Sequence, residues 1–228
     1  MALQERAVRT KRAILVAAAE VFDELGYEAA TISEILKRSG VTRGALYFHF
    51  SSKEELAQGV LAEQVDALPT VPQRDLKLQQ SLDEALLLTH LLRRDTGDPI
   101  VRGSVRLTVD QGPAQGGFDR RLPMQGWIAH THALLEEAKA NGELLPYVDT
   151  LSLAKLTVGA FTGVQVLSDI MTGRDDMPER VSDLYRFLLA SVAAPTALSQ
   201  LDFSPERGTR VHQQIMKLRQ EAAESPEV

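Results

Sequence analysis

Ten residues near the start of the chain, Val41–Phe50 (VTRGALYFHF), include side chains whose chemistry suits contact with nucleic acid. Arg43 can form two parallel hydrogen bonds with O6 and N7 of a guanine. The Tyr47 hydroxyl, the His49 ring and the ammonium of nearby Lys53 can reach phosphate oxygens. The ten residues include no acid. This chemistry predicts a surface that reads and holds DNA.

The same ten residues also contain apolar side chains with the spacing of a packed helix face. On a helix that begins at Thr42, Leu46 and Phe50 lie one turn apart and share a face. Together with Val41 they are the expected core residues, and Tyr47 and His49 lie off that face. The spacing leaves Phe48 undecided between the core and a contact with a thymine methyl group or a sugar.

Gly44 is the most informative residue of this segment. A glycine inside a short helix costs about 1 kcal/mol relative to alanine. A surface that needs close approach of the backbone gives a reason for that cost, and Ala45 beside it keeps the surface low. A core role gives no reason for a glycine at this position.

The helices that position this segment are indicated by their capping residues. A first helix is expected from Thr10, as its N-cap, to Leu25, with Gly26 as a stop. Thr31 and Glu34 form a capping box that begins a second helix, which Gly40 ends. Thr42 caps the third helix, and Ser51–Glu55 (SSKEE) caps a fourth that runs to about Ala67. Short helices joined by a glycine-containing turn are typical of a helix-turn-helix.

Apolar residues recur with helical period along the rest of the chain, and strand signals are nearly absent. We therefore expect an all-α protein of about ten helices. Residues 1–53 are predicted to form a helix-turn-helix domain and residues 54–228 a larger helical body. A glycine-rich stretch, Gln111–Arg121, is expected to be a mobile loop. The remaining helices are expected at about 75–94, 99–109, 123–139, 151–171 and 178–194, and from Ser204 onward.

Composition narrows the possible functions. The chain has 228 residues, a net charge of −6 and no cysteine. The absence of cysteine excludes disulfides and thiol catalysis. Residues 1–53 carry eight bases and six acids, a charge of +2, whereas the remainder is −8, so one end only is suited to phosphate. The charged N-terminus is not a signal peptide, and no run approaches a membrane span. We expect a cytoplasmic protein.

Nothing in the sequence favours an enzyme or a metal site. His130 and His132 are the one close pair among the five histidines, and side chains two residues apart on a helix point apart. No phosphate-binding loop, dinucleotide fingerprint or serine-hydrolase elbow is present. We expect no catalytic residue, no metal and no cofactor.

The stretch from Thr10 to Lys53 resembles the DNA-binding domain of TetR-type regulators. The matching segments are GYEAATISEI, SGVTRGALYFHF and SKEEL. The resemblance implies an all-α homodimeric repressor with a DNA-binding head and a ligand-binding body. It places base contacts on Arg43 and Gly44 with Thr42 and Ala45 alongside, and an aromatic DNA contact on Phe48. It places phosphate contacts on Thr31, Ser33, Tyr47, His49 and Lys53.

Several stretches of the body are similar to a narrower branch, the γ-butyrolactone and butenolide receptors of actinomycetes. These stretches are VRGSVRLTVDQ (Val101–Gln111), Trp127, EEAKANGELLP (Glu136–Pro146) and AKLTVGAFTGVQVLSD (Ala154–Asp169). The resemblance implies a receptor for a small autoregulator that derepresses antibiotic production. The candidate ligand contacts are Gln64, Leu88, Trp127, Val158, Phe161, Thr162 and Gln165.

The residues are compatible with a small neutral lactone as the ligand. The segment Leu151–Ile170 is apolar nearly all round, which predicts burial on more than one face. No Lys or Arg lies within Leu156–Asp169, and apolar walls with a few neutral polar groups suit an uncharged ligand. Three of the candidates also have a plain structural explanation: Trp127 as core, Thr162 bonded back to a helix carbonyl, and Gln64 on the solvated surface.

Three alternatives remain open. The first is a TetR-type pseudo-receptor or drug-responsive repressor that binds an antibiotic or its intermediate. The second is a DNA-binding protein without a ligand, and the third, least favoured, is an enzyme.

Overall fold

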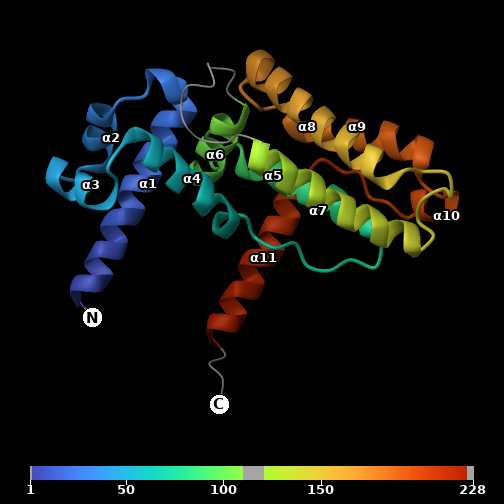
Figure 1. The fold of residues 1–228 in the computed structure, drawn as a ribbon. Helices are drawn as coiled ribbons and strands as arrows, with labels where there is room; N and C mark the ends of the chain where they lie inside the picture. Colours follow the sequence, from blue (N-terminus) through green and yellow to red (C-terminus); the bar gives the residue numbers. More distant parts are fainter. Residues whose placement is uncertain (1, 110–120, 225–228) are drawn as a thin grey trace. The chain divides into compact units, whose positions relative to one another are not determined.

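The computed structural model describes residues 2–109 and 121–224. Residues 1, 110–120 and 225–228 lie outside it, as do the side chains of residues 2–4, 65, 66 and 223. The loop expected at 111–121 falls almost wholly on undescribed residues. The described residues form eleven helices and no strand, so the all-α prediction is confirmed (Figure 1). The helices are α1 (Ala2–Ala29), α2 (Ile32–Ser39), α3 (Arg43–His49), α4 (Lys53–Ala67), α5 (Lys77–Leu91), α6 (Pro99–Val109), α7 (Arg121–Ala140), α8 (Thr150–Thr172), α9 (Met177–Val192), α10 (Pro195–Leu198) and α11 (Arg207–Glu224).

Contacts divide the chain into two compact units. The head unit is Met1–Leu68 with Gly97–Pro123, and the body unit is Pro69–Thr96 with Met124–Val228. This division differs from the boundary predicted at residue 53, because α4 and α6 pack in the head unit. Leu56, Ile100 and Leu107 are fully buried in the same apolar cluster as the residues of α1.

A close crossing of two helices organises the head unit. A Cβ built on Gly103 of α6 would lie 2.4 Å from the Ala19 carbonyl oxygen of α1, so no larger residue fits there. An ion pair between Arg102 Nε and Asp23 Oδ2 at 3.0 Å joins the same two helices. These contacts hold α1, which carries much of the core of the head unit, against α6, a helix much later in the sequence.

Two features of α1 differ from the sequence prediction or sharpen it. The helix begins at Ala2 rather than at Thr10, and the Thr10 hydroxyl donates back to the Arg6 carbonyl at 2.9 Å instead of capping a helix. The predicted stop at Gly26 is confirmed, because this residue has φ 74° and interrupts the helix. Only a short helical piece follows it, up to Ala29.

In the body unit, α5 and α11 are joined by a buried charge cluster. The Asp83 carboxylate is completely buried and accepts hydrogen bonds from Arg207 Nε at 2.6 Å, Arg207 Nη2 at 2.7 Å and Arg74 Nε at 2.8 Å. Gly208 brings the two helices into close contact, since a Cβ there would lie 2.2 Å from the Leu86 oxygen. Removing one partner from such a buried pair costs roughly 3–5 kcal/mol, so this cluster fixes α11 on α5.

The start of α5 is capped from a distant part of the chain. Its N-cap residue, Leu76, has no side-chain hydrogen bond to offer. The buried carboxylate of Glu143 instead accepts from the backbone N–H groups of Lys77 and Leu78, each at 2.9 Å. A carboxylate at this end also complements the helix dipole.

The helices α8 and α9 expose large apolar side chains. Ile170 of α8 is 74% exposed and Phe187 of α9 is 73% exposed. A single chain therefore buries only part of residues 151–170, and the predicted burial of a second face would need a partner such as another copy. The other exposed apolar residues of α8 are Leu151, Leu156, Val166, Leu167 and Met171. An apolar surface of this kind marks a contact with another molecule.

By length and composition alone, α8 is also long and apolar enough to cross a membrane. The expectation that no segment reaches this length and hydropathy is therefore wrong for α8. The criterion is weak evidence, because the core helices of soluble proteins also meet it.

Candidate nucleic-acid interface

The turn between α2 and α3 has the predicted capping geometry. Thr31 and Glu34 form a complete capping box, in which the Glu34 N–H donates to Thr31 Oγ1 at 3.2 Å. Gly40 ends α2 in the left-handed region with φ 67°. Thr42 begins α3 by accepting from the Ala45 N–H at 3.2 Å. The helix-turn-helix expected from spacing is present.

The predicted core residues of the VTRGALYFHF segment hold α3 in place. Leu46 and Phe50 are buried in the head cluster, and Val41 packs against it half-buried. Phe48, which spacing left undecided, is 81% exposed and therefore belongs to the outer surface. Its ring contacts the His49 ring edge to face, with centroids 5.1 Å apart.

The exposed face of α3 carries a positioned cation. The Arg43 guanidinium carbon lies 5.5 Å from the centroid of the exposed Tyr47 ring. The first turn of α3 contains no acidic residue. Stacking on an aromatic ring restricts a guanidinium while leaving its N–H groups able to donate, so Arg43 is held ready for an outside acceptor.

Gly44 is not required by the packing of this chain. A Cβ built on it would meet nothing within 4 Å. Gly103 and Gly208 differ, because a Cβ on either would collide with backbone. The cost of a glycine in α3 thus has no explanation inside the described part of the protein, which supports a surface against which another molecule fits closely.

Three of the ten predicted DNA contacts have side chains that form hydrogen bonds within the protein. The Thr31 hydroxyl donates to Glu34 Oε2 at 2.8 Å, and Thr42 Oγ1 accepts from the Ala45 N–H at 3.2 Å. The Lys53 ammonium donates to three backbone carbonyls. The other seven lie on the surface or half-buried, and they are Ser33, Arg43, Gly44, Ala45, Tyr47, Phe48 and His49.

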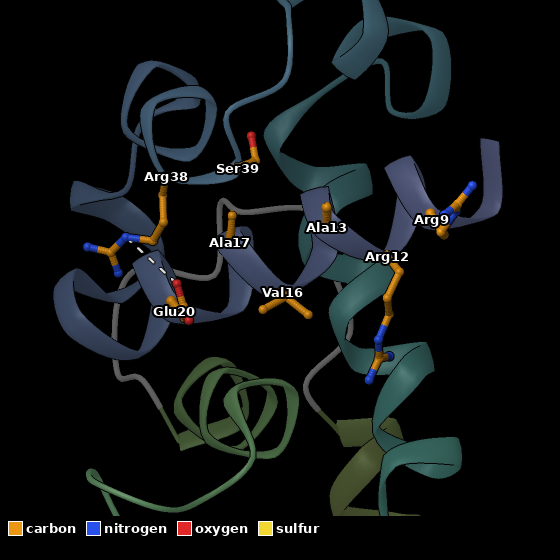
Figure 2. A pocket seen from close by; sticks show the side chains of 8 residues that line it. All are labelled: Arg9, Arg12, Ala13, Val16, Ala17, Glu20, Arg38 and Ser39. Carbon is orange, nitrogen blue, oxygen red and sulfur yellow. Dashed lines mark ion pairs between the residues drawn. The ribbon is translucent and has the colours of Figure 1, made fainter. Parts of the chain in front are cut away.

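A shallow hollow of about 480 Å³ lies between α1 and the end of α2, and sequence reasoning did not predict it. Figure 2 shows its apolar floor along α1 and its charged rim. Two rim arginines are neutralised: Arg12 pairs with Glu63 at 2.6 Å, and Arg38 pairs with Glu24 at 2.7 Å. The bond from Arg38 holds the pKa of the Glu24 carboxyl below its usual value. None of the predicted DNA contacts lines the hollow.

The predicted ligand contacts are divided between the two units. Leu88, Trp127, Val158, Phe161, Thr162 and Gln165 lie in the body unit, and Gln64 lies in the head unit. Thr162 bonds back to the Val158 carbonyl at 2.9 Å, the plain structural role considered for it. Gln165 is buried, and the remaining body residues of this set are half-buried.

Gln64 is the ligand candidate with the clearest structural signal. Its side chain is only 5% exposed, so the alternative of a solvated surface residue is excluded. Among the residues that the structure describes, its Nε2 has no hydrogen-bond partner. Leaving a buried amide donor unsatisfied costs about 1–3 kcal/mol, and such a group is a candidate for binding an acceptor from outside the chain.

Sequence reasoning did not predict a row of hydrogen-bonded polar side chains in the body unit. Gln80 Nε2 donates to Glu84 Oε1 at 3.2 Å, and Glu84 Oε2 lies 2.7 Å from His130 Nε2. The bond to Glu84 raises the pKa of His130. His132 lies 3.7 Å from Glu136 on its own helix, so the two histidines have different partners, as their spacing predicts. Among the described residues no group of ligands suits a metal.

Replacing Arg43 with alanine should lower operator affinity by about 1–3 kcal/mol and relax sequence preference at one base step. Random DNA should be bound nearly as before, because Arg43 is assigned a base edge rather than a phosphate. Arg43→Lys is the matched control: it keeps the charge but loses the bidentate fork. Fluorescence anisotropy on an operator, its single-base variants and random DNA measures all three. Equal losses on operator and random DNA for Arg43→Ala would remove the base-reading role.

Comparison with known proteins agrees with this geometry. The family model for bacterial regulatory proteins of the tetR family matches residues 14–60. The A-factor receptor protein of Streptomyces griseus is 40% identical over 88% of this chain and 70% of its own length. The crystal structure of TylP, a TetR regulator from Streptomyces fradiae, has 58% identity and a TM-score of 0.83, covering 92% of this chain and 99% of that one.

A crystal structure described as a γ-butyrolactone receptor, an ArpA-like protein, is 26% identical with a TM-score of 0.70. It covers 92% of this chain and 99% of that chain. TylP is described as a regulator and the other two as receptors, and the similarity extends through head and body alike. The chain belongs to the TetR family of bacterial regulatory proteins.

Proposed function

We propose that this protein is a cytoplasmic transcriptional repressor that binds a palindromic operator as a homodimer. A small γ-butyrolactone or butenolide would release it and so switch on genes of secondary metabolism. TetR regulators bind operator DNA and dimerise. The single observation that carries the proposal is the outer face of α3, where exposed Arg43 lies beside a glycine that the chain itself does not need.

The division of α3 into two faces supports operator binding. Buried Leu46 and Phe50 fix the helix, and Arg43, Tyr47 and Phe48 project from it. In a helix-turn-helix the second helix enters the major groove with its N-terminal residues toward the bases. Arg43 and Gly44 occupy that N-terminal position in α3.

The exposed apolar residues of α8 and α9 support dimerisation. A palindromic operator needs two recognition helices about 34–36 Å apart or a multiple of this distance. Gly159 and Gly163 lie one turn apart on α8, and a Cβ on either would meet nothing within 4 Å. A second copy could therefore approach the backbone of α8 closely.

Two observations support a neutral ligand. The body candidates Val158, Phe161 and Thr162 lie in a stretch of α8 without a cation, which does not suit a carboxylate. In the head unit, the orphan Nε2 of Gln64 can donate to a carbonyl oxygen such as that of a lactone.

The proposal is tested by a mobility shift on DNA from upstream of the protein's own gene. Increasing concentrations of a synthetic alkyl γ-butyrolactone or butenolide should release the DNA, because ligand and DNA affinities are reciprocally coupled. Release by an antibiotic or its intermediate, without any response to lactones, would favour the pseudo-receptor alternative. Binding that no small molecule weakens would refute ligand control.

Replacing Gln64 with leucine should separate ligand response from folding. The change removes an unsatisfied buried donor, so the free energy of unfolding should stay the same or increase. The lactone concentration that releases the operator should rise about 5-fold, which corresponds to the loss of one hydrogen bond of average strength. Gln58→Leu is the matched control, because Gln58 is exposed on the same helix. An unchanged lactone response for Gln64→Leu would remove Gln64 from the ligand contacts.

A further inference from the structure

The Lys53 side chain is fully engaged inside the head unit. Its Nζ donates to the carbonyl oxygens of Tyr27 at 2.8 Å, Glu28 at 3.2 Å and Ala30 at 3.1 Å. It also lies 4.5 Å from the centroid of the Tyr27 ring. A lysine ammonium has three N–H donors, so each has an acceptor within the protein. A bond to phosphate would require one of the three to be broken.

Two of the accepting carbonyls, those of Tyr27 and Glu28, belong to the last turn of α1, and the third, that of Ala30, lies just beyond its end. Gly26 interrupts α1, and the chain turns at Ala30 into the capping box of α2. The last carbonyls of a helix lack intrahelical donors, and a cation near them is favourable. Lys53 therefore completes the end of α1, immediately before α2 begins.

The position of Lys53 in its own helix supports the same conclusion. It is the first residue of α4, where the helix dipole favours acids, and Glu54 and Glu55 follow it there. A cation at this position is unfavourable for α4. The stability of α4 therefore does not explain a lysine at this position, whereas its contacts with the end of α1 do.

We propose that Lys53 is a positioning residue that joins the start of α4 to the corner between α1 and α2, and that it does not contact the DNA backbone. It thereby fixes both ends of the α2–α3 pair, because Ala30 immediately precedes Thr31, the N-cap residue of α2, and Lys53 closely follows α3. This inference rests on the proposed operator binding. It replaces the phosphate contact that the family resemblance implied for this residue.

The two roles predict different salt dependence. A phosphate contact contributes about 0.9 to the slope of log affinity against log salt, and its loss weakens all DNA alike. A positioning residue leaves that slope unchanged, and its loss weakens the operator more than random DNA. Lys53→Met keeps most of the aliphatic stem and removes the three donors, so it is the variant of choice.

The experiment measures operator and random-DNA affinity at several salt concentrations for the full-length protein. For Lys53→Met we expect an operator loss of roughly 10-fold, little change on random DNA and an unchanged slope. Lys37→Met is the matched control, because it removes the same charge from an exposed position of the head. A slope reduced by about 0.9 with equal losses on both DNAs would overturn the proposal.

Lys53→Arg is a second variant that distinguishes the two roles if Lys53→Met folds poorly. An arginine retains the charge and reaches phosphate well, but its planar fork cannot match three carbonyls grouped around one nitrogen. Operator selectivity should therefore fall for Lys53→Arg as well, whereas a phosphate role predicts full activity. If the wild-type protein shows no preference for any operator over random DNA, the proposed function itself fails. That outcome differs from a reduced salt slope in Lys53→Met, which contradicts only the role of Lys53.

Discussion

Replacing Phe187 with glutamate is expected to abolish the proposed dimer and to lower operator affinity by at least about 100-fold. Phe187 is 73% exposed on α9, a helix that packs against α8, which also carries exposed apolar residues. A charge placed in a closed apolar interface is not compensated, and its desolvation is costly. A monomer presents one recognition helix instead of two, and specific binding exceeds non-specific binding by about 10³–10⁷.

Light scattering and DNA affinity on the same samples check this result. Ile170→Glu on α8 should act in the same way, since Ile170 is equally exposed. Leu218→Glu is the control, because Leu218 is an exposed apolar residue of α11, away from both helices in the sequence. A Phe187→Glu protein that stays dimeric would exclude this part of α9 from the interface.

Local signals predicted much of the fold. The capping box at Thr31, the left-handed glycine at position 40 and the Thr42 cap all depend on residues within one helical turn, so neighbours in sequence are enough to identify them. The inner face of α3 also followed from helical spacing, as buried Leu46 and Phe50 show.

Contacts between distant residues could not be predicted in this way. Nothing near Leu76 indicates how α5 begins, because its capping carboxylate comes from Glu143. The cluster of Asp83 with Arg207 joins residues 124 positions apart. Lys53 is the clearest case in the candidate site, because nothing near it in the sequence indicates its three backbone acceptors, which lie 23 to 26 residues earlier.

The exposed or buried state of several side chains could also be learned only from the structure. The apolar period of residues 151–170 predicts a buried helix, and periodicity cannot distinguish a face buried within the chain from one that another copy would cover. Likewise, a glutamine such as Gln64 gives no sign in the sequence that its amide is buried without a partner.

Gly44 offers the test in which stability and DNA binding should move in opposite directions. Gly44→Ala should raise the free energy of unfolding by up to about 1 kcal/mol, because alanine is the better helix former. No neighbour opposes the added methyl group, since a Cβ there meets nothing within 4 Å. Operator affinity should nevertheless fall, because the same methyl group would occupy the space that the DNA needs.

A larger side chain at position 44 should increase the loss of operator affinity without lowering stability. Leucine has nearly the helix propensity of alanine, so Gly44→Leu should remain at least as stable as the wild type, while operator affinity falls by about 100-fold or more, the equivalent of losing one or two base contacts. Thermal unfolding and anisotropy on operator and random DNA measure the two quantities independently. Gly126→Ala is the control, because Gly126 also lies in a helix with open space around it but in the body unit. If Gly44→Leu bound the operator as tightly as the wild type, close approach of DNA to α3 would be refuted, and with it the structural reason for a glycine at that position.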